Sequence, residues 1–281
     1  DMPENILKLL IDSISIQKEY IYFCKSLLGL DDLNQLTKIN RDDLKENLLI
    51  GKTHPQLKNL DLSSENNHNS IFKILRKKNI LLHHPYDLFK TSVEEFINRA
   101  ADDPLVMAIK ITLYRVSKDS PIISALMRAA ENGKEVMTLV ELKARFDEDN
   151  NIQWAKQLEQ AGIHVVYGII GFKTHTKIAL IVRKEKGRLR NYFHIGTGNY
   201  NSNTSKFYTD LGLLSTDPDI ASDLLELFNY LSGFSKQKSY QKLLVSPSSM
   251  REKFIFLIKR EIKNAEKGKK AEIIAKMNSL V

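Results

Sequence analysis

The sequence predicts an α/β domain built on a mixed, mainly parallel sheet and preceded by the end of an α-helical domain. Three observations support this class. From residue 92 onward, apolar runs rich in β-branched residues alternate with amphipathic segments, which is typical of β-α-β units. Residues 1–50 instead carry apolar side chains at three- and four-residue spacing, which indicates helices. After residue 173, two strand-like runs follow each other across a short polar turn, which predicts an antiparallel hairpin.

The elements from residue 92 onward can be predicted in order. Ser92 and Glu95 have capping-box spacing at the start of a helix over 92–104. Strands are expected where β-formers dominate, and helices where apolar residues recur on one face. The strands are expected at 105–115, 134–145, 163–170, 174–185, 190–198 and 211–216, and the helices at 120–133, 150–162 and 217–234.

The flanking segments suggest the domain limits. Residues 1–50 are expected to be helical, and the polar, then basic stretch that starts at Leu60 is expected to be a domain boundary followed by an entry strand before Pro85. Residues 243–281 contain a very basic helix and then an apolar run like the first strand of another α/β unit. The chain begins with Asp1 and stops straight after that run, so we expect it to be a piece of a longer protein.

Composition narrows the classes of partner. Lys and Arg number 42 against 34 Asp and Glu, which gives a net charge of +8 and a pI near 9.3. A basic surplus favours phosphates, nucleic acid or an acidic membrane face. Charge alone does not choose among these partners, and a solvated basic surface explains it equally well.

Cysteine usage and hydropathy bear on location. Cys24 is the single cysteine, so the chain can form no internal disulfide and has no CxxC pair for zinc, which fits a reducing, cytoplasmic compartment. Cys24 lies in an apolar helical pattern and is expected to be buried rather than nucleophilic. No run approaches 18 apolar residues, so no membrane span is expected.

Two arginines lie at expected strand ends. Arg115 closes the run "LVMAIKITLYR", and Arg145 follows the next strand. In parallel α/β sheets, ligands gather beyond the carboxyl ends of the strands. Two guanidiniums at one edge can clamp a phosphate. Alternatively, each arginine pairs with a nearby acid such as Asp147 or Glu148.

The stretch "GFKTHTKIALIV" places His175 and Lys177 at an expected strand start. Side chains alternate along a strand, so His175 and Lys177 share one face. An imidazole is a competent nucleophile toward phosphorus, and a neighbouring ammonium stabilises charge on the attacked phosphate. This H-x-K pattern is short, and a lone histidine entering a strand is more often structural.

The next strand ends in "HIGTGNYN", where Gly196 and Gly198 allow close backbone approach to a ligand and Asn199 supplies a polar group. Together with His-x-Lys, this is similar to half of the H-K-D site of the phospholipase D superfamily. That pattern has Asp five residues after the lysine, whereas this chain has Val182. Asp210 is our candidate for the carboxylate that orients His175. Tyr208 either stacks on a nucleotide base or is a core tyrosine.

Several segments together resemble polyphosphate kinases of the first type. The resemblance covers essentially the whole chain and is carried by "DPLVMAIKITLYR", "ELKARFDE", "GFKTHTKIALIVR", "YFHIGTGNYN", "FYTDLGLL" and "LLVSPSSMR". It implies that residues 1–61 end the family's helical head domain. It likewise implies that 62–242 are the first catalytic C-terminal, phospholipase D-like domain, and that 243–281 begin the second one.

The resemblance also implies an activity, which is the reversible transfer of the terminal phosphate of ATP to polyphosphate through a phosphohistidine. His175 stands where the phosphorylated histidine stands, and Tyr208 stands at a nucleotide-contacting position. Arg115 and Arg145 correspond to the magnesium and phosphate site. Because an arginine is not a metal ligand, they are expected to act through phosphate oxygens that Mg²⁺ shares. Lys177 and Asn199 fall on the H-x-K and G-x-G-N elements.

The resemblance further implies ATP, ADP and inorganic polyphosphate as partners and a homo-oligomer, dimer or tetramer, with no nucleic acid. A cytoplasmic protein, also peripheral at the inner face of the membrane, is compatible with it. Two alternatives stay open. One is a phospholipase D-like phosphodiesterase, in which the same histidine attacks a diester. The other is a non-catalytic module that binds polyanions.

Overall fold

The computed structural model describes residues 2–25, 29–46, 49–58, 60, 70–116, 120–141, 148–169, 171–235 and 239–277. The chain divides into two compact units, Asp1–Leu48 and Leu49–Val281.

The first unit is helical, as its periodicity predicts. It contains helix α1 (Glu4–Ile14) and three 3₁₀ segments, Lys18–Tyr20, Leu30–Lys38 and Asp42–Leu44. None of the residues described in this unit is buried. The expectation that Cys24 is buried is therefore wrong, because its side chain is exposed. The apolar pattern around it does not form the expected helix, because residues 21–25 adopt irregular structure and Tyr22 and Phe23 are also exposed.

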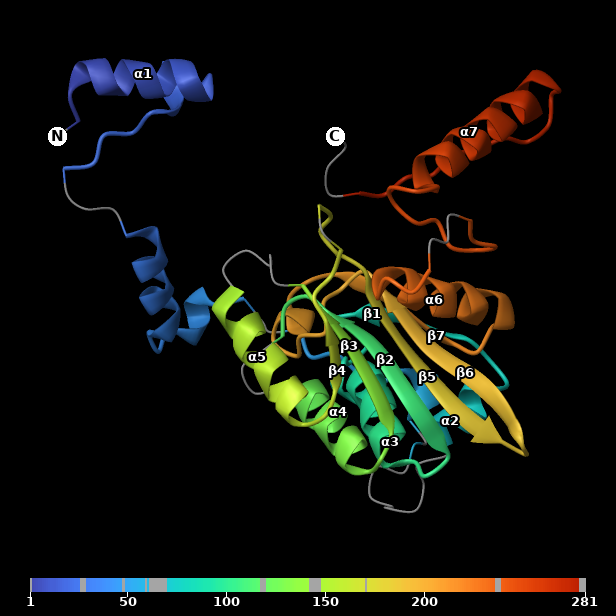
Figure 1. The fold of residues 1–281 in the computed structure, drawn as a ribbon. Helices are drawn as coiled ribbons and strands as arrows, with labels where there is room; N and C mark the ends of the chain where they lie inside the picture. Colours follow the sequence, from blue (N-terminus) through green and yellow to red (C-terminus); the bar gives the residue numbers. More distant parts are fainter. Residues whose placement is uncertain are drawn as a thin grey trace. The chain divides into compact units, whose positions relative to one another are not determined.

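The second unit is built on a seven-stranded sheet with the order β1-β7-β6-β5-β2-β3-β4 (Figure 1). The strands are β1 (Ile80–His84), β2 (Val106–Leu113), β3 (Glu135–Val140), β4 (His164–Val166), β5 (Lys177–Glu185), β6 (Arg188–Gly196) and β7 (Asp210–Ser215). β5 and β6 form the expected antiparallel hairpin, from Lys177 opposite Gly196 to Glu185 opposite Arg188.

The sheet is mixed, as predicted, but the expectation of mainly parallel pairing needs correction. Among the described strands, β2 pairs in parallel with β3, and β3 with β4. The other four pairings, β1–β7, β7–β6, β6–β5 and β5–β2, are antiparallel. Helical crossovers join β2, β3 and β4, as parallel pairing requires, whereas in the other half only β5 and β6 are joined by a tight hairpin and the pairings β1–β7 and β5–β2 join strands far apart in the chain.

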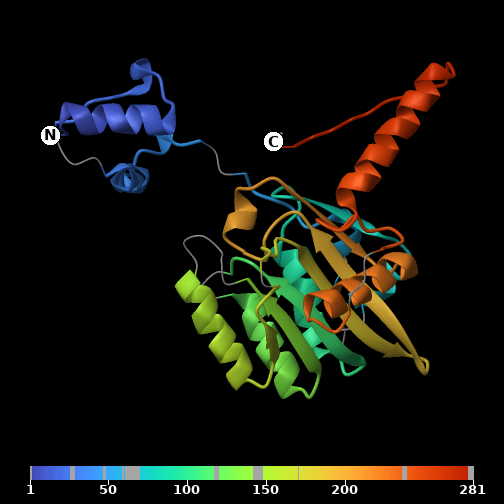
Figure 2. The same cartoon turned by 45° about the horizontal axis from the view of Figure 1, so that its top comes forward.

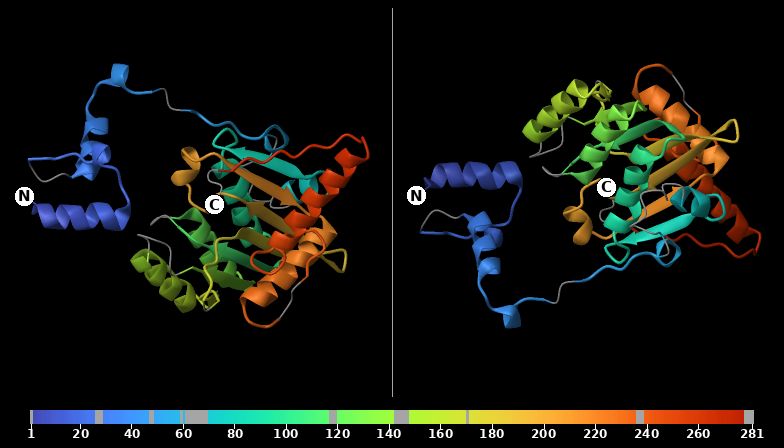
Figure 3. Two further views of the ribbon diagram at one scale, coloured as in Figure 1. Left: turned by 90° about the horizontal axis from the view of Figure 1, so that it is seen from above. Right: turned by 90° about the horizontal axis from the view of Figure 1, so that it is seen from below.

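Helices cover both faces of the sheet (Figure 3). α2 (Ser70–Leu75), α3 (Glu95–Asp102), α4 (Pro121–Glu131) and α5 (Glu148–Gln160) lie on one face, and α6 (Pro218–Leu231) lies on the other. Both faces of β5 are consequently buried, which explains its continuous apolar run. Two short 3₁₀ segments, Pro55–Leu57 and Thr204–Lys206, complete this part of the unit.

The helix starts are set by local chemistry. Ser120 caps α4 by accepting from Ile123 N–H, with Pro121 at the first helical position. Asp217 caps α6 in the same way, ahead of Pro218. The predicted capping box at Ser92 is wrong, because a π-helical turn (Lys90–Glu94) leads into α3 and Ser92 Oγ donates to Leu88 O at 2.7 Å.

The C-terminal segment contains α7 (Met250–Glu266), the predicted basic helix (Figure 2). None of its residues is buried. The strand expected after it is absent from the described residues 271–277. Across the described ranges, no helix combines the length and apolar character that crossing a membrane requires.

Candidate functional site

One edge of the sheet collects most of the described residues that the sequence singled out. β2 and β3 end at this edge, β5 starts there, and β6 ends beside the start of β7. The antiparallel register therefore brings the segment before Lys177, the loop after Gly196 and Asp210 to the same end as Arg115. This is the upper edge of the sheet in Figure 1.

His175 and Lys177 meet around a tyrosine that sequence reasoning missed. The His175 and Tyr114 rings lie edge to face with centroids 4.8 Å apart. Lys177 Nζ lies 4.9 Å from the centroid of the Tyr114 ring and donates to the carbonyl oxygen of His175 at 2.6 Å. β5 begins only at Lys177, so His175 lies just before the strand, exposed, whereas Lys177 is buried. Tyr114 directly precedes Arg115 at the end of the expected strand, and no sequence motif singled it out.

Cations dominate the electrostatics of this pair. Partial burial, and then the charges of Lys177, Lys173 and Arg115, lower the pKa of His175 below its ordinary 6.5. Burial lowers the pKa of Lys177 to about 8, with Arg115 acting in the same direction and Asp210 opposing it. At neutral pH, His175 is therefore an uncharged imidazole with a free lone pair.

A buried carboxylate fixes the backbone next to His175. Glu141, which directly follows β3 and is 5% exposed, accepts from Thr174 N–H through Oε2 at 2.6 Å. Its own carbonyl accepts from Asn151 Nδ2 at 2.8 Å. Glu141 thus positions the segment that carries His175. Its place at a strand end is the signal that could have found it.

Hydrogen bonds with Asp210 and its neighbour Leu211 fix the loop after β6. Thr197 Oγ1 donates to Asp210 Oδ1 at 2.8 Å and accepts from Leu211 N–H at 3.0 Å. A Cβ on Gly198 would lie 2.7 Å from Asp210 Oδ2, so only glycine fits against this carboxylate. Among the described residues, Asp210 bonds Thr197 and acts electrostatically on Lys177, and it makes no contact with His175.

Two buried histidines lie behind this loop and were not predicted as site residues. His194, at 2% exposure, bonds Tyr200 Oη through Nδ1 at 2.8 Å, and burial lowers its pKa to about 3. His84 bonds Asp87 O through Nδ1 at 2.7 Å. A small cavity is lined by His84, His194, Asn199 and Asp210. Within the described part of the chain, Asn199 Oδ1 and the Nε2 atoms of both histidines have no hydrogen-bond partner.

The remaining predicted residues differ in placement. Arg115 lies beside the pair, with Cζ 5.7 Å from the centroid of the Tyr114 ring. Tyr208 is 65% exposed rather than a core residue, and no other predicted site residue contacts its ring among those described. Arg145 and its alternative partner Asp147 lie outside the described residues, and the side chain of Glu148 is likewise not described.

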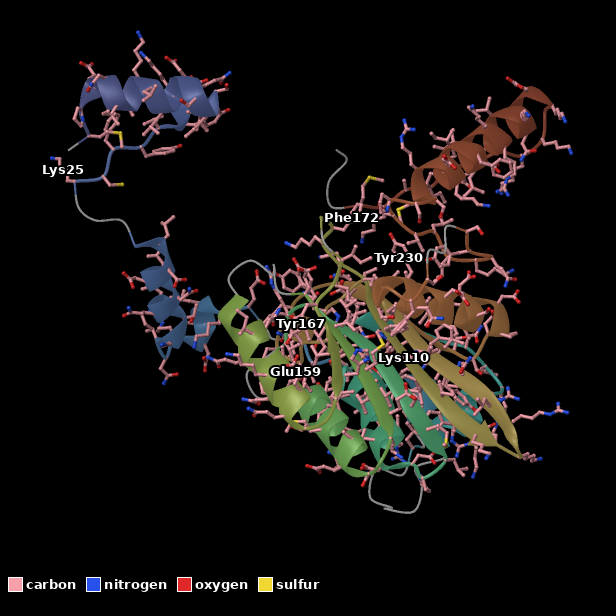
Figure 4. All side chains as sticks on the ribbon, viewed as in Figure 1. Lys25, Lys110, Glu159, Tyr167, Phe172 and Tyr230 are labelled. Carbon is pink, nitrogen blue, oxygen red and sulfur yellow. The ribbon has the colours of Figure 1, made fainter. Side chains whose placement is uncertain are left out.

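A cavity of about 600 Å³ opens beside His175. Its lining includes Phe172, Lys173 and Tyr230, together with residues 243–247 of the segment after α6. Figure 4 labels Phe172 and Tyr230 at this edge of the sheet. The exposed imidazole thus borders a space whose described lining is mostly apolar and includes the ammonium group of Lys173.

Magnesium fits this edge only in the company of phosphate. Among the described residues, no cluster of three or more His, Cys, Asp or Glu side chains could hold a metal ion. Mg²⁺ at nucleotide sites commonly takes one or two protein oxygens and completes its shell with phosphates and water. Asn199 Oδ1 and the Asp210 carboxylate, which line the same small cavity, are the described oxygens suited to that role.

These features define a class of protein. It is an α/β domain whose sheet edge presents an uncharged histidine and clustered cations, an arrangement suited to phosphate chemistry. The family model "Polyphosphate kinase C-terminal domain 1" matches residues 70–237, and "Polyphosphate kinase C-terminal domain 2" matches residues 243–281. The chain belongs to the polyphosphate kinase family.

Individual relatives agree with the family match. The chain is 58% identical to the polyphosphate kinase of Parasynechococcus marenigrum over its full length, which covers 40% of that protein. It is 49% identical to that of Synechocystis sp., covering 99% of this chain and 39% of the relative. The crystal structure of polyphosphate kinase from Porphyromonas gingivalis superimposes with a TM-score of 0.73 and 32% identity, covering 95% of this chain and 41% of that one. The chain therefore spans about 40% of the length of these relatives.

Proposed function

We propose that the protein transfers the terminal phosphate of ATP to a growing polyphosphate chain, reversibly, through a phosphohistidine at His175. One observation carries the proposal. His175 is an exposed imidazole whose pKa is lowered by partial burial of its ring and then by the charges of Lys177, Lys173 and Arg115. Such a site keeps a nitrogen nucleophile uncharged beside groups that attract a polyphosphate anion.

The chemistry follows from this arrangement. The imidazole lone pair forms a bond to the γ-phosphorus of ATP, and the bond to the bridging oxygen breaks with its electron pair leaving on ADP. Lys177 and Arg115 hold the oxygens of the transferring group. A terminal oxygen of polyphosphate then attacks the same phosphorus, and the P–N bond breaks to restore neutral His175.

The other residues have supporting roles in this proposal. Tyr208 stacks its exposed ring on the adenine, and Asn199 offers its amide to phosphate. Asp210 accepts the hydrogen bond that fixes the turn at Thr197, and its negative charge favours the protonated form of Lys177. Arg145 is proposed as a second phosphate ligand, as the sequence predicts. Mg²⁺, when bound to the triphosphate, would neutralise part of its charge.

The wider expectations belong to the same proposal. A cytoplasmic homo-oligomer that handles ATP, ADP and polyphosphate, and that also associates with the inner face of the membrane, fits the family resemblance and the basic surplus. The domain limits at residues 61 and 242 likewise stay predictions.

The test uses the protein as its gene encodes it, incubated with γ-³²P-labelled ATP. Acid-labile, base-stable label is expected on His175, and His175→Ala should abolish both labelling and polyphosphate synthesis. His164→Ala, at an exposed position of β4, is the matched control and should label normally. Synthesis that survives in His175→Ala would contradict the proposal. Absent label together with phosphodiester cleavage would favour the phospholipase D-like alternative.

A further inference from the structure

A second cavity, of about 1200 Å³, lies at the opposite end of the sheet. It is bordered by the turn of the β5–β6 hairpin and by the first half of α6. We call it the hairpin groove and define it by Arg76, Arg183, Glu185, Lys186, Arg188 and Arg190. Because β5 runs from Lys177 to Glu185, the groove lies roughly 26 Å from the site edge at 3.3 Å per residue.

Positive charge in the hairpin groove exceeds negative charge. Five of the six defining residues are cations, and Glu185 is the one carboxylate among them. That carboxylate lies 3.0 Å from Arg76, 2.6 Å from Arg183 and 3.3 Å from Arg190. Lys186 and Arg188 are exposed, and no described acidic side chain forms an ion pair with either. The groove therefore attracts anions after its internal pairs have formed.

The groove is built on a rigid frame, which distinguishes it from a solvated charge run. Arg183 is 2% exposed and bonds Asp103 Oδ2 at 2.9 Å. Its guanidinium also lies 5.2 Å from the centroid of the Phe72 ring. Tyr192 Oη donates to Glu185 at 2.6 Å. These contacts hold the arginines in place before any ligand arrives.

We propose that the hairpin groove binds inorganic polyphosphate at a point remote from phosphoryl transfer, an inference that rests on the proposed function. A linear polymer can occupy the site edge and the groove at once, and the second contact adds avidity. Among the described residues, no aromatic side chain lines the groove, whereas sites for single-stranded nucleic acid combine basic residues with aromatic side chains on which the bases stack. A concave wall also suits a narrow chain better than a flat bilayer.

The hairpin turn permits a variant that should not disturb folding. Lys186 and Gly187 have φ angles of 48° and 79°, as in a two-residue type I′ turn, for which Asn-Gly is the preferred sequence. Lys186→Asn combined with Arg188→Gln therefore removes two exposed charges while keeping the turn. The matched control is Lys259→Gln with Lys263→Gln on α7, which removes two exposed charges outside the groove.

Binding of end-labelled polyphosphate is measured by fluorescence anisotropy over a range of salt concentrations. The protein is used at the full length that its gene encodes, and every variant also carries His175→Ala. The groove variant should bind about tenfold more weakly, with a salt slope reduced by about 1.4, or 0.7 per lost contact. The control variant should bind like the parent.

Equal weakening in both variants, or none in either, would overturn the proposal. If the groove variant loses binding to phosphatidylserine vesicles but still binds polyphosphate like the parent, the groove is a membrane-binding surface and the proposal is also overturned. His175 labelling in the unmutated protein is independent of this readout. If His175 is labelled normally and the groove variant binds polyphosphate like the parent, only the proposal for the hairpin groove is contradicted. If His175 is not labelled, the proposed function is contradicted.

Discussion

At the scale of single residues, the candidate site contains two groups whose pKa values burial shifts in the same direction. His175 and Lys177 both have lowered pKa values, each chiefly through burial. The shift makes His175 a nucleophile at lower pH than a free histidine. For Lys177, the lowered pKa means that the ammonium group loses its charge at a weakly alkaline pH.

The pH dependence of kcat/KM for the transfer from ATP tests these shifts, since this quantity reports the free enzyme. The acid limb should lie below pH 6.5, because the lowered pKa keeps His175 uncharged there. The alkaline limb should lie at about pH 8, where Lys177 loses its proton. Lys177→Arg should remove the alkaline limb, because a guanidinium stays protonated. An acid limb above pH 6.5 would contradict the geometry around His175.

At the scale of elements, one carboxylate joins α6 to the segment that follows it. Asp223 is 4% exposed, and its two oxygens accept from the backbone N–H groups of Gln241, Lys242 and Leu243 at 2.7–2.9 Å. The same segment lines the cavity beside His175. The helix therefore fixes one wall of that cavity through a single side chain.

Replacing Asp223 with Ala should lower the free energy of unfolding by about 2–4 kcal/mol, because three backbone donors lose a charged acceptor in a buried place. Urea denaturation followed by circular dichroism measures the change. Asp219→Ala is the control, since Asp219 is half exposed and 3.7 Å from Lys242, and it should cost under about 1 kcal/mol. Similar losses in both variants would show that Asp223 does not anchor the segment.

At the scale of the whole second unit, a buried ion pair joins distant parts of the chain. Arg183 on β5 and Asp103 at the end of α3 are 80 residues apart in sequence, and both side chains are 2% exposed. A contrasting pair, Arg128–Asp102, has side chains 40% and 34% exposed. The two pairs have similar chemistry in very different surroundings.

Truncating one partner of each pair should show how strongly burial changes the contribution of an ion pair to stability. Arg183→Ala should destabilise the fold by about 3–5 kcal/mol, because Asp103 is left as an uncompensated buried charge. Arg128→Ala should cost no more than about 1 kcal/mol, because water solvates Asp102. Chemical denaturation of the two variants provides the measurement. An Arg183→Ala variant as stable as Arg128→Ala would mean that water reaches the buried pair.

Local patterns were sufficient for much of this architecture. The apolar runs predicted β2, β3 and the β5–β6 hairpin, and Ser120 and Asp217 begin helices as Ser and Asp do before proline. The capping box at Ser92 failed because a π-helical turn moved the helix start away from it. The burial predicted for Cys24 failed because residues 21–25 do not form the helix that the apolar pattern indicated, and the cysteine is exposed.

The sequence by itself determined most of the element types and the family, and it singled out His175 and Lys177 as candidates, because these depend on residue type and short spacing. Only the tertiary structure decided that Tyr114 lies against both residues, that Glu141 positions Thr174, and that Asp210 bonds Thr197 rather than His175. The hairpin groove is also a tertiary feature, since Arg76 and Arg183 are far apart in the chain. The physical reason is that such contacts depend on strand order and register. Here the pairings β1–β7 and β2–β5 join strands that are far apart in the chain, and no local pattern specifies them.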